Sequence, residues 1–186
     1  MSDSKDRAMQ IVGYNKNGDR EKDDFYATPG EATVSLLKAE KFEGSIYEPC
    51  CGEGHISKVL EAHGYRVKSS DLIDRGYGKP RQDFLFERQQ HANIVTNPPY
   101  KNALDFVEQA VELSNLKCAL LLKLSFLEGQ KRKLFFEARP PSRIHVFSQR
   151  QSLMKNGESY TGGMMALAWF VWDKEDKSGE AKVRWL

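Results

Sequence analysis

The segment from Cys118 to Leu122 reads CALLL and is apolar at every position. A strand with one face in water alternates apolar and polar residues, so this uninterrupted run predicts a strand buried on both faces. Shorter strands are predicted at Ser45–Glu48, Tyr65–Ser70 and Asn93–Thr96, with intervening helical stretches. This alternation is typical of a mostly parallel sheet with helices on each side. The chain is therefore expected to adopt a doubly wound α/β fold.

Apolar residues at helical spacing mark three segments, which begin after Pro29, after Gly54 and near Leu104. The organisation changes after Pro140 and Pro141. From there Arg143–Phe147 and Met164–Trp172 both read as strands, with no convincing helix between them. These two strands predict a C-terminal antiparallel hairpin.

A chain of 186 residues fits one globular domain and leaves no room for a second. Residues 1–24 are polar and lack apolar periodicity, so we expect a flexible N-terminal arm followed by a single domain over residues 25–186. No run approaches the roughly 18 apolar residues of a membrane span, and the N-terminus lacks the apolar block of a signal peptide. We therefore expect a cytoplasmic protein with no membrane partner.

The three cysteines, Cys50, Cys51 and Cys118, give neither a disulfide framework nor the spacing of a zinc site. They are expected to be reduced packing residues, and no metal site is predicted.

Positive charge is unevenly distributed along the chain. The whole sequence has a net charge of +2, whereas the segment Lys123–Lys155 carries eight Lys or Arg against two Glu, a net charge of +6. A basic segment in an otherwise acidic chain suits a surface that faces phosphates. A solvated helix face would explain the same pattern.

A glycine-containing turn, EPCCGEG over residues 48–54, follows the first predicted strand. Glycine lets the backbone approach a ligand closely, and the following helix N-terminus offers N–H groups to an anionic group. Only Gly52 and Gly54 are present, so this is not the GxGxxG of dinucleotide-binding folds, and no GKS or GKT follows to bind a triphosphate. Taken alone, the turn is equally well explained as a structural one.

Two acidic residues strengthen the case for a ligand at this turn. Asp71 ends the next predicted strand, about twenty residues on, where a carboxylate binds a ribose diol in related architectures. Asp83 and Phe84 add a carboxylate for an amino group and a ring for stacking against a base. The pattern indicates a nucleoside-containing ligand, although a core Phe beside a surface Asp would look the same.

The tetrapeptide Asn97-Pro98-Pro99-Tyr100 directly follows the strand that ends at Thr96. By chance it would occur about once in a few thousand chains of this length, and it lies at the carboxyl end of a strand, where open α/β sheets bind ligands. Two successive prolines stiffen the backbone and remove two N–H donors, which leaves carbonyl acceptors. The alternative is a purely structural role, in which Asn97 caps the following helix and the two prolines end the strand.

An aromatic amine is a poor nucleophile, because its lone pair is delocalised into the ring. Oxygen acceptors from the Asn97 side chain and the Pro98 backbone, both accepting from one NH2 group, would favour a nucleophilic lone pair on that nitrogen. Tyr100 is suited to hold the base by stacking. The tetrapeptide therefore indicates chemistry on an amino group.

With these motifs, the chain resembles class I S-adenosylmethionine-dependent methyltransferases, specifically the amino-methyltransferases that include DNA adenine-N6 and cytosine-N4 enzymes. Compact phage and prophage DNA methyltransferases share a similar EPxCGEGH turn and FLEG segment. The resemblance covers roughly Phe25 to Lys174. It implies a mostly parallel, seven-stranded Rossmann-like sheet and S-adenosylmethionine as cofactor, with nucleic acid, DNA above RNA, as partner.

The resemblance also implies roles for individual residues. Asn97, Pro98, Pro99 and Tyr100 would be the catalytic tetrad. The substrate would be bordered by Tyr100, Lys123, Lys131 and Arg132. The cofactor would be bound by Tyr26, Thr28, Pro29, Glu48, Pro49, Cys50, Gly52, Gly54, Asp71, Leu72, Asp83 and Phe84.

Two departures from the family pattern leave alternatives open. Glu53 and His55 stand in the cofactor loop where relatives often have small residues, and the chain has no room for an inserted DNA-recognition domain. The same tetrad occurs in enzymes that methylate guanine N2 in RNA or a glutamine amide in a protein. A methyltransferase fold retained only for binding nucleic acid or protein is the alternative from another class.

Overall fold

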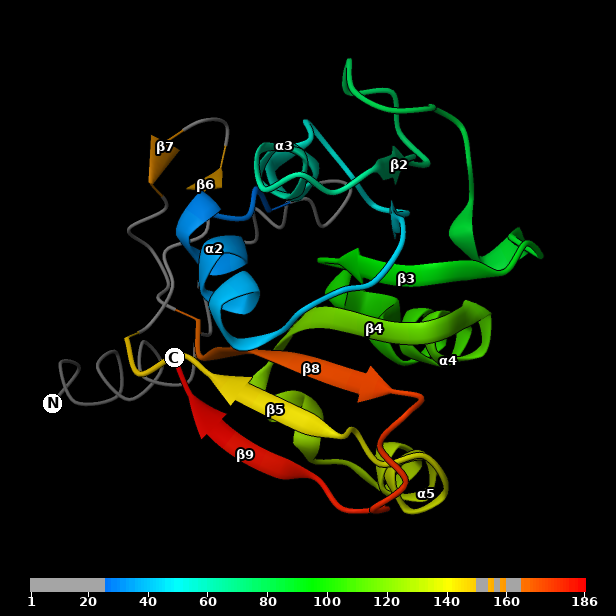
Figure 1. Ribbon diagram of the computed structural model, residues 1–186, viewed down its shortest axis with the longest axis vertical. Helices are drawn as coiled ribbons and strands as arrows, with labels where there is room; N and C mark the ends of the chain where they lie inside the picture. The colour runs from blue at the N-terminus through cyan, green and yellow to red at the C-terminus, as the bar shows by residue number, and fades with distance from the viewer. Residues whose placement is uncertain (1–25, 150–153, 156–157, 160–164) are drawn as a thin grey trace, which may run out of the picture.

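The computed structural model describes residues 26–149, 154–155, 158–159 and 165–186. Their centre is a seven-stranded sheet with the order β2-β1-β3-β4-β8-β5-β9 (Figure 1). Strand β8 is antiparallel to both of its neighbours, and every other pair in the sheet is parallel. The predicted mostly parallel α/β sheet is confirmed, whereas the arm predicted for residues 1–24 lies outside the described residues.

The strands of this sheet are β1 (Ile46–Glu48), β2 (Val67–Ser69), β3 (His91–Thr96), β4 (Ser114–Lys123), β5 (Arg143–Val146), β8 (Leu167–Asp173) and β9 (Lys182–Trp185). A separate pair is formed by β6 (Met154–Lys155) and β7 (Glu158–Ser159). The α-helices are α2 (Gly30–Ala39), α3 (His55–Ala62), α4 (Ala103–Leu113) and α5 (Gln130–Ala138). Short 3-10 helices are η1 (Phe84–Phe86), η2 (Tyr100–Asn102) and η3 (Leu124–Leu127).

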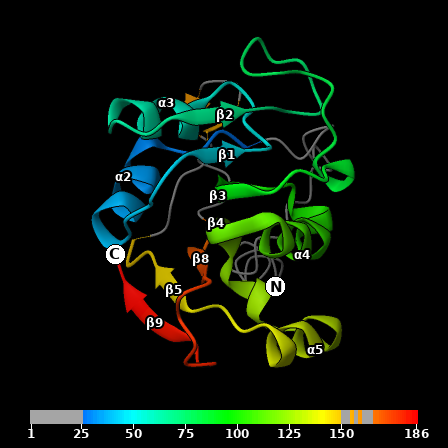
Figure 2. The ribbon, with the colours of Figure 1, turned by 45° about the vertical axis from the view of Figure 1, so that its right-hand side comes forward.

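Helices cover both faces of the sheet. Figure 2 shows α2 and α3 on one side and α4 and α5 on the other. The central strand β4 supplies both cores: Cys118, Leu120 and Leu122 pack on the α4 side, and Ala119 and Leu121 on the α2 side. All five side chains are fully buried, which is why this run contains no polar residue.

The C-terminal strands differ in part from the prediction. Strands β5 and β8 pair antiparallel, as expected, with Ile144 opposite Phe170. Strand β8 begins at Leu167, while the predicted start at Met164 lies outside the described residues. A further strand, β9, pairs parallel with β5 and forms the sheet edge. It was not predicted, because all four of its residues are exposed and it lacks a buried apolar face.

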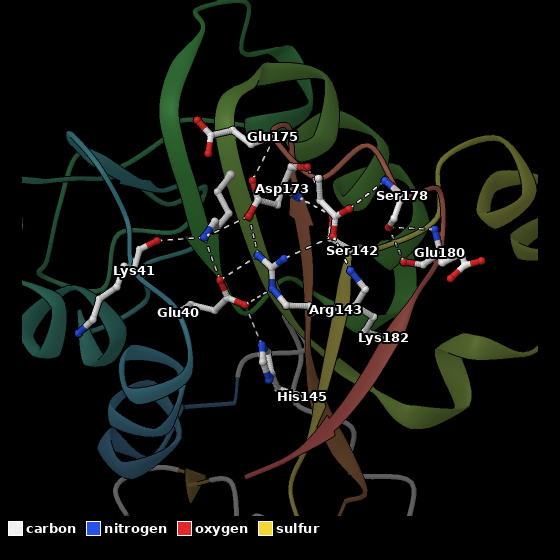
Figure 3. Close-up of polar contacts among 12 residues, drawn as sticks. Glu40, Lys41, Ser142, Arg143, His145, Asp173, Glu175, Ser178, Glu180 and Lys182 are labelled. Carbon is white, nitrogen blue, oxygen red and sulfur yellow. Dashed lines mark hydrogen bonds and ion pairs between the residues drawn. The ribbon is translucent and has the colours of Figure 1, made fainter.

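A buried charged cluster ties the end of α2 to the sheet (Figure 3). Glu40, which caps α2, accepts hydrogen bonds from Lys117 on β4 at 2.8 Å and from the guanidinium of Arg143 on β5. Nε2 of His145 lies 2.8 Å from the same carboxylate. Arg143 also donates to Asp173 at the end of β8 at 2.6 Å. The cluster fixes α2, and therefore the chain segment that enters it, against three strands.

Candidate active site

One cavity lies where the loops after β1, β2 and β3 meet the segment that leads into α2. The carboxyl ends of parallel strands lie at the same edge of a sheet, so residues distant in sequence converge there. The cavity is lined by Tyr26, Ala27, Thr28, Glu48, Pro49, Cys50, Cys51, His55, Ile56, Asp71, Leu72, Ile73, Arg75, Gln82, Asp83, Phe84, Asn97, Pro98, Pro99, Tyr100 and Phe106.

The cavity gathers most of the predicted site. All four residues of the tetrapeptide line it, as do the predicted cofactor residues other than Pro29, Gly52 and Gly54. Sequence reasoning missed several lining residues. Ala27 and Gln82 are adjacent to predicted residues, so the same motifs could have identified them. Arg75 and Phe106 are not part of any motif that indicates a site.

The side-chain amide of Asn97 has a defined orientation. Its Nδ2 donates to the backbone oxygen of Tyr26 at 3.2 Å and to Oγ1 of Thr28 at 3.1 Å. A backbone carbonyl can only accept, so the nitrogen end of the amide must face Tyr26. Oδ1 of Asn97 is buried, and no donor among the described residues reaches it. A buried acceptor without a hydrogen-bond donor lowers the stability of the fold, unless a ligand group donates to it.

Tyr100 begins η2 beside this amide and contacts residues of two other elements. Its ring stacks on that of Tyr26, with the centroids 6.1 Å apart and the planes at 23°. Nζ of Lys123, at the end of β4, lies 4.6 Å from the Tyr100 centroid, within the range of a cation–π contact. The predicted substrate residue Lys123 is therefore placed directly at the tetrapeptide.

Asp71 connects the loops after β1 and β2. Its Oδ2 accepts from the backbone N–H of Gly52 at 2.8 Å, and its Oδ1 accepts from that of Ile73 at 2.9 Å. Each carboxylate oxygen has more than one acceptor direction, so these bonds orient the carboxylate and leave it able to accept from hydroxyl groups. Leu72, next in the chain, is 55% exposed and presents an apolar surface to the cavity.

The need for glycine at position 54 has a reason within the chain. Gly54 is the N-cap of α3 and lies in the left-handed region, with φ of +82°. A Cβ at this position would lie 2.6 Å from the ring of Tyr77. The space beside Gly54 is filled by this tyrosine from the loop after β2, and Gly54 does not line the cavity. The positive φ and the close approach of the Tyr77 ring account for glycine here, and the predicted cofactor role of Gly54 stays a prediction.

Asp83 and Phe84 are partly structural. Oδ1 of Asp83 accepts from the backbone N–H of Leu85 at 3.0 Å and caps η1. Phe84 is 2% exposed and packs against Tyr47 and Phe106. Both residues nevertheless line the cavity. Phe84 is therefore both a core residue and a lining residue of the cavity.

Burial strongly affects the pKa values of the titratable groups at the end of β1 and in the turn that follows it. Burial raises the pKa of Glu48 well above its usual range, against the lowering effect of the hydrogen bond from Ser57. Burial also raises the pKa of Cys50 well above its usual range and that of Cys51 to about 12. Both thiols are free, and high thiol pKa values agree with the predicted packing role.

A second groove adjoins the cavity and shares Tyr100 with it. Lys101, Leu104 and Asp105 line one side, and Gly129, Lys131 and Arg132 line the other. The predicted substrate residue Lys131 is exposed there. Both helices that begin at this groove, α4 and α5, lack a side-chain hydrogen bond at the N-cap.

Arg132 also serves the chain itself. Its guanidinium donates to the backbone oxygens of Glu128 and Ser125 and lies 5.2 Å from the ring centroid of Phe126. These contacts hold the segment between β4 and α5.

The basic segment predicted over Lys123–Lys155 does not form one surface. Arg143 belongs to the buried cluster around Glu40, and Lys133 pairs with Glu137 on α5. The side chains of Arg150 and Lys155 lie outside the described residues. Among the described residues, the positive charge that borders the cavity and its adjoining groove comes from Lys123, Lys131 and their neighbours.

Within the described part of the chain, no group of three or more His, Cys, Asp or Glu side chains could hold a metal ion. The same residues include no helix that is long and apolar enough to cross a membrane.

No protein-family model and no curated protein sequence matches the chain. Solved structures do match. A Listeria monocytogenes protein described as a class I S-adenosylmethionine-dependent methyltransferase has a TM-score of 0.61 and 15% identity, and the match covers 97% of this chain and 72% of that one. A Pyrococcus horikoshii protein described as an RNA methyltransferase has a TM-score of 0.60 and 14% identity, over 90% and 97% of the two chains.

A third match is a protein of Vibrio vulnificus described as the modification subunit of a type I restriction enzyme. Its TM-score is 0.60 at 12% identity, over 98% of this chain and 50% of that one, so the chain spans half of that subunit. At such identities the likeness establishes the architecture. The chain has the fold of the class I S-adenosylmethionine-dependent methyltransferases.

Proposed function

We propose that the chain is an S-adenosylmethionine-dependent methyltransferase that acts on an exocyclic amino group of a nucleic-acid base, with adenine N6 in DNA as the favoured target. The observation that carries the proposal is the buried Oδ1 of Asn97, for which the described residues supply no donor. The amide is held with this oxygen as its remaining acceptor. A target NH2 group is the donor that would satisfy it.

The other end of the cavity fits the cofactor. The Asp71 carboxylate, oriented by two backbone N–H groups, is suited to accept from the two hydroxyls of a ribose. Leu72 offers exposed apolar surface for a purine ring, and Phe84 lines the same cavity. The turn after β1, from Glu48 to Cys51, lines the same cavity and would border the amino-acid tail of the cofactor. Bound S-adenosylmethionine would supply an electrophilic methyl group next to Asn97.

The chain's contribution to the reaction is position and electrostatics. Oδ1 of Asn97 and the backbone oxygen of Pro98 would each accept one N–H of the target amine, which localises the nitrogen lone pair. Their dipoles also stabilise positive charge as it develops on that nitrogen. Tyr100 would hold the base plane by stacking. No residue is required to form a covalent bond with the substrate.

The favoured substrate rests on two supports of different kinds. One of the similar structures is described as a modification subunit of a restriction enzyme and another as an RNA methyltransferase. Lys123 and Lys131 place positive charge at the tetrapeptide and in the adjoining groove. Both favour nucleic acid over a protein glutamine. Extracting a base from a duplex costs about a few kcal/mol, so single-stranded substrate is expected to react faster.

The test is incubation with S-adenosylmethionine tritiated on the methyl group and separate samples of single-stranded DNA, duplex DNA, RNA and protein. Nucleoside analysis of labelled DNA is expected to give N6-methyladenine. Label in N2-methylguanine of RNA or in a protein glutamine would overturn the adenine assignment but retain amino-group methylation. Cofactor binding without transfer to any substrate would instead favour a binding module.

A further inference from the structure

We propose that Thr28 is a positioning residue: its hydroxyl accepts from Nδ2 of Asn97 and, together with the Tyr26 carbonyl, holds the amide with Oδ1 as the acceptor for the target. The inference rests on the proposed function, because the choice of atom matters only if a target amine binds there. The family resemblance implies a cofactor-lining role for Thr28. A link from Thr28 to the tetrapeptide is a separate role.

The geometry gives each end of the amide a distinct environment. The two hydrogens of Nδ2 have two acceptors, Oγ1 of Thr28 at 3.1 Å and the backbone oxygen of Tyr26 at 3.2 Å. Rotating the amide by half a turn would bring Oδ1 against the Tyr26 carbonyl, where two acceptors would face each other. Without the Thr28 hydroxyl, one N–H loses its acceptor, and the amide is held through a single bond.

The fold, rather than a ligand, fixes the position of the Thr28 hydroxyl. Thr28 is 3% exposed and precedes Pro29, the residue before α2. Helix α2 is tied to the sheet by a hydrogen bond of 2.9 Å from Nε1 of Trp169 to the backbone oxygen of Ala32. Its other end is held by the cluster around Glu40 (Figure 3). The acceptor for Asn97 is therefore in place before any ligand binds.

A positioning role and a cofactor-lining role predict different kinetic changes. A side chain that only lines the cofactor site changes the dissociation constant of the cofactor. A side chain that orients Asn97 acts on the transfer step and changes kcat. Thr28→Val replaces the hydroxyl with a methyl group of similar size, and Thr28→Ser keeps the hydroxyl.

The experiment compares wild type, Thr28→Val and Thr28→Ser by kcat of methyl transfer, by calorimetry with S-adenosylmethionine, and by NMR of the Asn97 side-chain NH2 in ¹⁵N-labelled protein. The Asn97→Ala spectrum identifies these signals. For Thr28→Val we expect kcat to fall roughly 5- to 30-fold, cofactor affinity to stay within about twofold, and the Asn97 signals to shift. Thr28→Ser should restore both kcat and the signals.

The inference is overturned if Thr28→Val weakens cofactor binding and leaves kcat unchanged, or if Thr28→Ser is impaired to the same degree. Unmoved Asn97 signals in Thr28→Val would also overturn it. If the wild-type chain transfers no methyl group, the proposed function fails, while the NMR comparison still decides whether Thr28 holds the amide.

Discussion

The backbone N–H of Gly52 donates a hydrogen bond to Oδ2 of Asp71, with an N···O distance of 2.8 Å. This bond joins the glycine turn after β1 to the loop after β2. It places the carboxylate at the cavity through a contact within the chain. In the sequence, only the order and spacing of their motifs associated the two loops. In the structure, this hydrogen bond joins them.

Asp71→Ala should weaken S-adenosylmethionine binding about 10- to 100-fold, because hydrogen bonds to a charged group contribute about 1.5 to 3 kcal/mol. Asp74→Ala is the matched control. Asp74 lies in the same loop and accepts from Gly76 but does not line the cavity. Calorimetry measures both variants, and equal affinities for Asp71→Ala and wild type would remove Asp71 from the cofactor site.

Gly54→Ala should destabilise the fold more than Gly64→Ala. Both glycines have φ above +80°, so each substitution costs about 1 kcal/mol through the backbone alone. Only at Gly54 does the new Cβ meet the Tyr77 ring, whereas nothing lies within 4 Å at Gly64. Overpacking adds about 1 kcal/mol or more. Urea unfolding measures the difference, and equal losses would show that Tyr77 does not occupy this space.

Glu40→Gln should lower the free energy of unfolding by about 3 kcal/mol at neutral pH, because it removes the most buried carboxylate beside Lys117 and Arg143, which then share only Asp173. Glu112→Gln, which breaks the exposed pair with Arg139, should cost less than about 1 kcal/mol. Denaturant unfolding of the two variants at pH 7 makes the comparison.

The effect of Glu40 should also depend on pH. Burial alone would raise the pKa of Glu40, but hydrogen bonds from His145, Arg143 and Lys117 outweigh it and hold the pKa well below its ordinary value of 4.5. A carboxyl with a depressed folded pKa contributes its full stability above the unfolded pKa and loses it as the pH falls toward the folded one. The gap between wild type and Glu40→Gln should therefore shrink below about pH 4.5. A constant gap down to pH 3 would contradict this.

Lys131→Ala should weaken binding of single-stranded DNA and reduce the slope of log affinity against log salt concentration by about 1, because one phosphate contact is lost. Lys133→Ala is the matched control on the same helix. Lys133 pairs with Glu137 and does not line the groove. Fluorescence anisotropy over a salt series measures both slopes. If the two variants change the slope equally, the groove is not a specific phosphate contact.

The sequence predicted those features in which local pattern and tertiary packing agree. The run Cys118–Leu122 is apolar because β4 is covered on both faces, and Asn97 follows β3 at the sheet edge where the loops converge. Helix α5 was not predicted. Among its residues only Phe135 is buried, so it lacks a clear apolar stripe. The bond from Asn97 to Thr28 spans 69 residues, and no local pattern encodes it.

The proposed role of Asn97 is to present its side-chain oxygen to a target amine beside the bound cofactor. Asn97→Ala removes that oxygen without altering Asp71 or the glycine turn. The decisive measurement is methyl transfer from tritiated S-adenosylmethionine to single-stranded DNA, with calorimetry of cofactor binding on the same samples. Methyl transfer by Asn97→Ala is expected to fall at least about 100-fold, while the cofactor dissociation constant changes by less than about threefold. Substantial methyl transfer by Asn97→Ala would contradict it.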